Sequence, residues 1–153
     1  MKKLPNSSHC FVCGLENDFG LHLSFYMDEE NRVNCETHFS AHFQGYPGVV
    51  HGGVVAAALD ETLARAVMVD DPDRFMFTGK LTTRYRRPVP TEQPIRLVGE
   101  VLNDRGRVAE CAAKLYGPEG ELLAEAEGLM MGIPEGMVDH SNQDGFWWGV
   151  VDD

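Results

Sequence analysis

Residues 48–68 read GVVHGGVVAAALDETLARAVM, and this stretch decides the fold. From Val54 to Val69 almost every residue is apolar, alanine and leucine favour helix, and Pro72 ends the run. A helix that is apolar on almost every side becomes buried when the protein folds. The sequence therefore predicts one long central helix that the rest of the chain encloses.

Charged side chains interrupt this apolar helix at three positions. Glu61 and Arg65 lie four residues apart with the acid first, which is the favourable order for a pair on a helix surface. Asp60 lies off that stripe, and its neighbours three and four positions away are three alanines and one leucine. Burying an unpaired carboxylate among apolar groups is costly, so Asp60 is a candidate functional group. The alternative is a structural aspartate that a nearby backbone amide satisfies.

The entrance to the helix, residues 47–53, has no serine, threonine, aspartate or asparagine in the capping position. Its paired glycines, Gly52 and Gly53, allow a tight turn and let a ligand approach the backbone closely. The first amides of a helix have no internal partner and lie at its positive end. They suit an oxygen atom that becomes negative during a reaction. A glycine-rich turn without a ligand is the alternative interpretation.

A long strand is predicted over residues 75–87. Alternation along this strand places Thr78 on one face together with three cations. These cations are Lys80, Arg84 and Arg86, and they form the densest basic cluster of the sequence. Two interpretations stay open: the cluster contacts the phosphates of a substrate, or it protects a sheet edge from pairing with another chain.

Two segments, PGVVHGGVVAAALDETLARA at 47–66 and TGKLTTRYRRPVP at 78–90, resemble the hotdog-fold thioesterases of the phenylacetic-acid-degradation and thioesterase-superfamily-member type. The shared features are His-Gly-Gly, an acid nine residues after that histidine, and a strand that ends in Tyr-x-Arg-Pro. The resemblance covers residues 8–132. It implies an α+β hotdog fold, in which a curled antiparallel sheet wraps around one long central helix. It also implies a homodimer or homotetramer, because the site of these proteins forms between two subunits.

The resemblance assigns roles to the candidate residues. Asp60 matches the acid that acts as general base or nucleophile on a thioester. Gly52 and Gly53 match the backbone donors of the oxyanion hole, and His51 belongs to the same catalytic motif. Thr78 matches a hydroxyl that holds the attacking water. The implied reaction is hydrolysis of an acyl thioester, most simply acyl-coenzyme A to free acid and coenzyme A, with no cofactor.

Substrate contacts are expected from Gln44, Arg84 and Arg86. Some relatives carry asparagine six residues before the histidine, where this sequence has Gly45 with Gln44 beside it. The alternative function is a hotdog protein that binds acyl-coenzyme A without hydrolysing it, although binding alone does not need an acid on an apolar face. A hotdog dehydratase would pair an acid with a downstream histidine, and the sequence shows no such pairing near the helix.

Cys10 and Cys13 form a Cys-x-x-Cys motif next to His9, whereas Cys35 and Cys111 lie singly in alternating runs and are expected to be buried small residues. Structural zinc usually takes four ligands, commonly from two such pairs. A redox pair would normally follow a strand and open a helix. A structural turn, a metal site and a redox pair therefore all stay open for this motif, and we assign it no metal.

The 153 residues are 43% hydrophobic and carry a formal net charge of −11, which fits one globular domain with a substantial core. This charge argues against nucleic acid or an anionic membrane as partner. A coenzyme A site must therefore depend on a local basic patch. The N-terminus has two lysines without an apolar stretch behind them, and no segment approaches transmembrane length, so we expect a cytoplasmic protein.

The remaining sequence predicts a hairpin, an antiparallel meander and a tail. The hairpin covers 21–27 and 32–39, and the meander covers 94–102, 108–116 and 122–131. From residue 134 onward the sequence has five acids, no lysine or arginine, and the triplet Phe146-Trp147-Trp148. We therefore divide the chain into a hotdog thioesterase domain at 1–133 and an acidic, aromatic tail at 134–153. The tail packs on its own domain, on a partner subunit or beside the acyl pocket.

Overall fold

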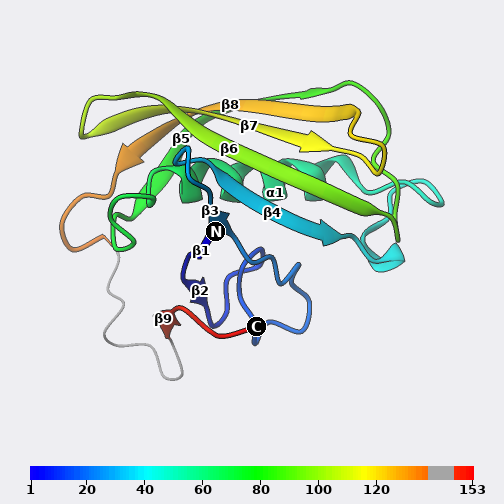
Figure 1. The fold of residues 1–153 in the computed structure, drawn as a ribbon, viewed down its shortest axis with the longest axis horizontal. Helices are drawn as coiled ribbons and strands as arrows, with labels where there is room; N and C mark the ends of the chain where they lie inside the picture. Colours follow the sequence, from blue (N-terminus) through cyan, green and yellow to red (C-terminus); the bar gives the residue numbers. More distant parts are fainter. Residues whose placement is uncertain (138–146) are drawn as a thin grey trace.

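The computed structural model describes residues 1–137 and 147–153, and within them one α-helix lies against a seven-stranded antiparallel sheet (Figure 1). The helix, α1, spans Gly52–Ala66 and follows a 3₁₀ turn, η1, at Ala41–Phe43. In spatial order the strands are β1 (Lys2–Lys3), β3 (Tyr26–Met27), β4 (Val33–His38), β6 (Pro94–Asp104), β7 (Val108–Tyr116), β8 (Leu122–Gly132) and β5 (Met76–Tyr85). The predicted α+β architecture with one central helix is confirmed.

The helix begins two residues before its predicted start at Val54 and ends three residues before its predicted end. It ends because the chain tightens: the Met68 N–H donates to the Arg65 carbonyl, three residues back, at 3.1 Å. The apolar residues that follow, through Val69, remain buried without being helical. No helix among residues 1–137 and 147–153 is long and apolar enough to cross a membrane.

Two glycines of the sheet let α1 lie unusually close to it. A Cβ atom on Gly99 of β6 would lie 2.7 Å from Thr62 Cγ2 and 2.8 Å from the Thr62 carbonyl oxygen. A Cβ atom on Gly128 of β8 would lie 2.7 Å from Leu63 Cδ1. The absence of side chains at these two points allows the helix and sheet to share one continuous core.

The predicted strand at 21–27 is wrong for most of its length. Only Tyr26 and Met27 pair as a strand, and His22 adopts a positive φ of 52°, which interrupts extended backbone. Leu21 and Leu23 instead donate their backbone N–H groups to the carbonyls of residues 11 and 12, at 2.8 Å each. Their apolar side chains are buried as the alternation indicated, but they belong to a loop rather than to the sheet.

The N-terminal segment and the end of the tail meet on the helix side of the sheet (Figure 1). Strand β2 (Asn6–Ser7) pairs antiparallel with β9 (Trp148–Gly149), so the described end of the tail packs on its own domain. Phe146 lies outside the described residues. The domain boundary at residue 134 stays a prediction.

These segments bury Arg65, which is only 1% exposed. Its Nη1 donates to the Pro5 carbonyl at 2.5 Å, and its guanidinium lies 4.6 Å from the centroid of the Trp148 ring. The expected Glu61–Arg65 pair forms, with 2.8 Å between Glu61 Oε1 and Arg65 Nε. The expectation that it lies on the surface is wrong, because residues far away in the sequence cover it.

Replacing Gly99 with alanine is expected to lower the free energy of unfolding by about 1–3 kcal/mol, the usual cost of overpacking a core. The new Cβ would meet the Thr62 backbone, which cannot rotate away. Gly132→Ala is the matched control, because its Cβ would lie 3.6 Å from its nearest neighbour, an ordinary contact. Urea denaturation of both variants measures the difference, and equal stabilities would contradict the close packing of α1.

Candidate active site

The entrance of α1 is capped by the side chain of His51. Its Nδ1 atom accepts a 2.9 Å hydrogen bond from the Gly53 N–H, a role usually taken by serine, threonine, aspartate or asparagine. Sequence reasoning found no cap because it considered only those four residue types. The Gly53 amide is therefore occupied, whereas the Gly52 N–H has no hydrogen-bond partner in the described part of the chain. Of the two predicted oxyanion donors, Gly52 is the available one.

A cleft of about 620 Å³ opens beside Gly52. It is lined by the helix entrance and by the segment that ends β5, including Val55, Tyr85, Arg86 and Arg87. The Tyr85 hydroxyl donates a 2.6 Å hydrogen bond to the Gly52 carbonyl and so ties the edge strand to the helix entrance. The cleft thus combines an apolar wall, an available backbone amide and two cations.

The Asp60 carboxylate lies two turns further along α1, half-buried beside β5. Thr78 Oγ1 donates a hydrogen bond of 2.5 Å to Asp60 Oδ1, so the structure brings these two predicted residues together. Burial raises the pKa of Asp60, the hydrogen bond from Thr78 opposes this rise, and the neighbouring Glu61 carboxylate adds to it. A raised pKa makes the carboxylate a stronger base.

A β-bulge at Gly79 changes the direction of the side chains along β5. Thr78 pairs with Met130 and Lys80 pairs with Leu129, so Gly79 is an extra residue without a partner position on β8. Before the bulge, even-numbered residues face the helix. After it, odd-numbered residues face the helix, and each pairs with a small or buried residue of β8.

The expectation that Thr78 shares a face with Lys80, Arg84 and Arg86 is wrong for this reason. Arg84 pairs with Glu125 in the register and lies in an outer hollow that Thr78 does not line. Arg86 follows the end of β5 and lines the cleft of Gly52, with its Nη2 atom 3.3 Å from Glu125 Oε1. The bulge therefore separates Thr78 from the two arginines with which it was predicted to share a face.

Gln44 lies just after η1 and is exposed. Its Oε1 atom accepts a 3.4 Å hydrogen bond from the Gly48 N–H, so it supports the loop that leads into α1. Gly45 lines the cleft, and Gln44 does not belong to the described residues that line it. A substrate contact by Gln44 stays a prediction.

The candidate residues fall into two groups along α1. Gly52, His51 and Arg86 line the cleft, whereas Asp60 and Thr78 lie outside it. Gly52 and Asp60 are eight residues apart, which is about 12 Å at the helical rise of ~1.5 Å per residue. One thioester carbonyl cannot contact both of these groups in the same chain.

Comparison with known proteins identifies the class to which this fold and site belong. A helix packed on a large antiparallel sheet is the arrangement of hotdog-fold structures. The family model described as the thioesterase superfamily matches residues 47–124, which include the helix entrance, Asp60 and Thr78. The chain therefore belongs to the thioesterase superfamily.

The curated relatives include thioesterases and a dehydratase. The chain is 31% identical over 98 residues to acyl-coenzyme A thioesterase THEM4 of Rattus norvegicus, covering 63% of this chain and 41% of that protein. It is 39% identical over 107 residues to the dehydratase FabZ of Desulforamulus reducens, covering 68% of this chain and 73% of that protein. The chain spans about half the length of the THEM4 proteins it matches, from 41% to 55%.

Solved structures agree on the fold. A crystal structure of a thioesterase superfamily protein matches with a TM-score of 0.74 and 31% identity, over 80% of this chain and 63% of that one. The PaaI protein of Escherichia coli matches with a TM-score of 0.66 and 14% identity, over 74% and 80% of the two chains. The second likeness shows the fold alone.

Sequence reasoning missed two residues of the cleft, Tyr85 and Arg87. Both belong to the Tyr-x-Arg-Pro motif, so the signal was present in the sequence. Selecting cations by alternation along the strand chose Arg84 instead, because alternation cannot reveal a bulge.

Replacing Asp60 with asparagine is expected to stabilise the protein at neutral pH. The raised pKa means that the folded state disfavours the charged carboxylate. Below the ordinary carboxyl pKa of about 3.9 this cost is absent, and it grows as the pH rises through the folded-state pKa. The unfolding free energy of Asp60→Asn should therefore exceed that of wild type at pH 7 and converge with it near pH 4. Asp70→Asn, at an exposed carboxyl after the helix, is the control, and a pH-independent difference would contradict this account.

Proposed function

We propose that this protein hydrolyses acyl thioesters, with acyl-coenzyme A as the substrate class. The observation that carries the proposal is the half-buried Asp60 carboxylate, which accepts a hydrogen bond from Thr78 on the edge strand. At the helix entrance, the Gly52 N–H is available as a hydrogen-bond donor in the described part of the chain. The names of the THEM4 relatives support the same chemistry. A structural neighbour from Streptococcus mutans, solved bound to acetyl CoA, supports the ligand class for the fold.

In the proposed reaction the thioester carbonyl accepts a hydrogen bond from the Gly52 amide, which stabilises the oxyanion as it forms. Asp60 removes a proton from a water molecule that attacks the carbonyl carbon, or it attacks that carbon itself and forms a mixed anhydride that water then hydrolyses, and Thr78 positions the attacking group. The carbon–sulfur bond breaks, and the thiolate of coenzyme A leaves and takes up a proton. The raised pKa of Asp60 suits either role, because it makes the carboxylate more basic than an exposed one.

Each complete site requires two chains on this proposal, since Gly52 and Asp60 of one chain lie about 12 Å apart. Strand β5 lies at the end of the sheet, and its outer edge has no partner strand among the described residues. Phe77 and Tyr85 on this strand are 40% and 51% exposed. Pairing of β5 with its copy in a second chain would cover these side chains and bring Asp60 of one chain toward Gly52 of the other.

Coenzyme A phosphates are assigned to the cations beside the cleft. Arg86 and Arg87 follow β5 directly and line the cleft, and the Arg87 side chain has no ion pair within the parts of the chain described. Local positive charge is needed here because the protein as a whole carries a net charge of −11.

The dehydratase relative raises a second reaction class, removal of water from a 3-hydroxyacyl thioester. That reaction requires an acid and a base that act together on neighbouring carbon atoms. The hydrogen-bond partner of Asp60 is a threonine hydroxyl, and no histidine bonds to this carboxylate in the described ranges. Hydrolysis is therefore favoured. A 3-hydroxyacyl-coenzyme A substrate separates the two reactions, since hydrolysis releases thiol and dehydration produces an enoyl thioester.

Asp60→Asn is expected to lower turnover by about 10²–10⁴-fold, the usual contribution of a general base. Thiol release from a panel of short, long and aromatic acyl-coenzyme A substrates measures it, with Asp70→Asn as the control. Turnover within about threefold of wild type would exclude the base role. Binding of acyl-coenzyme A by the wild type without any thiol release would favour the non-hydrolytic alternative.

Gly52→Ala is expected to lower kcat more than about tenfold, because the methyl group occupies space that the thioester carbonyl needs. Its Cβ would lie 3.6 Å from the Tyr85 ring, an ordinary contact, so the melting temperature should change little. Gly53→Ala is the matched variant, whose Cβ would lie 3.1 Å from His51 Nδ1 and disturb the cap. If Gly52→Ala lost activity only in proportion to its lost stability, the oxyanion role of the Gly52 amide would be refuted.

Mixed dimers test whether the site is shared. Asp60→Asn and Gly52→Ala chains, co-expressed with different tags and purified together, should recover activity that neither variant has alone. One of the two sites in such a dimer has an intact Gly52 and an intact Asp60. If the mixed dimers were as inactive as the two variants alone, Gly52 and Asp60 of the same chain would have to act in one site.

Replacing Arg86 and Arg87 together with alanine is expected to raise KM and leave kcat nearly unchanged, the pattern of lost uniform binding. The wild-type KM should rise with salt for the same reason. Arg84→Ala is the matched control, because Arg84 lines the outer hollow and is not among the described residues that line the cleft. If Arg84→Ala raised KM and the double variant of Arg86 and Arg87 did not, the phosphates would be assigned to the outer hollow instead.

A further inference from the structure

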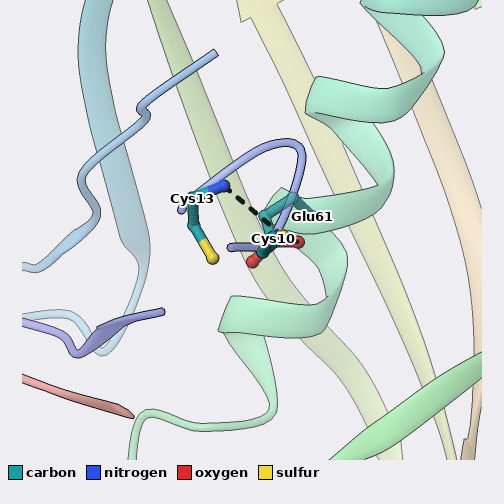
Figure 2. A group of neighbouring side chains, drawn as sticks. All are labelled: Cys10, Cys13 and Glu61. Carbon is teal, nitrogen blue, oxygen red and sulfur yellow. Dashed lines mark hydrogen bonds between the residues drawn. The ribbon is translucent and has the colours of Figure 1, made fainter. Parts of the chain in front are cut away.

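A second group of reactive side chains lies where the N-terminal loop meets α1. Cys10 and Cys13 from the N-terminal loop meet Glu61 from the helix, and their sulfur and oxygen atoms all lie within 4.8 Å of one another (Figure 2). Cys13 is 2% exposed, Cys10 is partly buried, and the Glu61 side chain is 18% exposed. The three groups come from segments about fifty residues apart, so the fold rather than local sequence brings them together.

The loop is wound tightly around the Cys10 sulfur. The backbone N–H group of Val12 points at this atom at 3.4 Å. The N–H group of Cys13 points at it at 3.5 Å, the contact drawn as a dashed line in Figure 2. Gly14 closes the turn by donating to the Cys10 carbonyl at 2.8 Å, and a Cβ on Gly14 would lie 2.3 Å from that carbonyl oxygen. Two amides directed at one sulfur stabilise the thiolate, which is the form that binds metal.

Glu61 is held in position to act as a third ligand. Its Oε1 atom accepts a 2.8 Å hydrogen bond from Arg65 Nε, and its Oε2 atom lies 3.8 Å from the Cys10 sulfur. In tetrahedral zinc sites with bonds of about 2.3 Å to sulfur and 2.1 Å to oxygen, these atoms lie ~3.6 Å apart. Arg65 therefore orients the carboxylate as the outer partners of metal ligands do, and Oε2 is left facing the Cys10 thiol, from which it accepts a hydrogen bond.

We propose that Cys10, Cys13 and Glu61 bind a zinc ion, with water as the fourth ligand. Two thiolates, one carboxylate, Zn²⁺ and the Arg65 cation sum to zero charge. Two thiols with the Glu61–Arg65 ion pair sum to zero as well. Binding thus exchanges two protons for Zn²⁺ and leaves no uncompensated charge in a largely buried place. The Cys₂ and carboxylate donor set suits zinc better than calcium or magnesium.

The ion would fasten the N-terminal loop to α1 at the residue that follows Asp60. Its role is structural on this proposal, since it supports the helix from the flank that the sheet does not cover. The pairing of two cysteines and one helix carboxylate explains why the sequence alone left the motif undecided: only two ligands are adjacent in the chain.

Metal titration of the full reduced chain tests the proposal. Apo protein is prepared with chelator and reductant, and Zn²⁺ is then added against a colorimetric chelator. One equivalent is expected to bind and to raise the melting temperature. Co²⁺ in place of Zn²⁺ should give near-ultraviolet thiolate-to-metal bands and the visible bands of a tetrahedral ion, which report the ligands without any mutation.

Variants assign the ligands. Cys10→Ser and Cys13→Ser should lose the metal, whereas Cys35→Ser, at a buried cysteine of β4, should keep it. Glu61→Gln should retain thiolate bands and bind at least about tenfold more weakly. Absence of Co²⁺ bands in the wild type overturns the proposal, as does equal loss of metal in Cys35→Ser. A Cys10–Cys13 disulfide in the purified chain, with no metal uptake after reduction, would instead identify a redox pair.

Discussion

The close approach of α1 to the sheet is the constraint on which the rest of the structure depends. Gly99 and Gly128 have no side chains to hold the helix away, so α1 packs directly on β6 and β8. At that depth Asp60 meets Thr78 of the edge strand β5, and Tyr85 of the same strand reaches the Gly52 carbonyl. A helix held further out by a few tenths of an ångström would strain both contacts. The candidate site is therefore positioned by core packing rather than by its own loops.

Much of this fold was predictable because its strong signals are local. An apolar helix and alternating strands with short turns are visible in single segments, and β7 and β8 lie where they were expected. The errors arise where contacts between residues far apart in the sequence determine the local structure. Gly79 becomes a bulge only in the register with β8, and His22 interrupts a strand whose hydrogen bonds go to the cysteine loop. No local pattern contains that information.

The arrangement of the candidate site was likewise predicted only in part. The pairing of Asp60 with Thr78 was expected through the resemblance, since eighteen positions separate the two residues and periodicity does not connect them. The cap by His51 is a local contact that was missed because histidine is not one of the usual capping residues. The covering of Arg65 by Trp148 depends on a tertiary contact and was not predicted either. Charge composition indicated that a coenzyme site needs local cations, but only the tertiary structure shows that Arg86 and Arg87, rather than Arg84, line the cleft.

The contact between the two ends of the chain has a kinetic consequence. Ser8 and Trp147 are 139 positions apart, yet the Trp147 N–H donates to the Ser8 hydroxyl at 3.2 Å, beside the pairing of β2 with β9. Closing so long a loop is entropically costly, and two-residue strands contribute few hydrogen bonds. We expect the pairing of β2 with β9 to form last in folding and to open first in the native state, before the seven-stranded sheet opens. The adjacent loop that carries Cys10 and Cys13 would then exchange its amide hydrogens faster than α1 does.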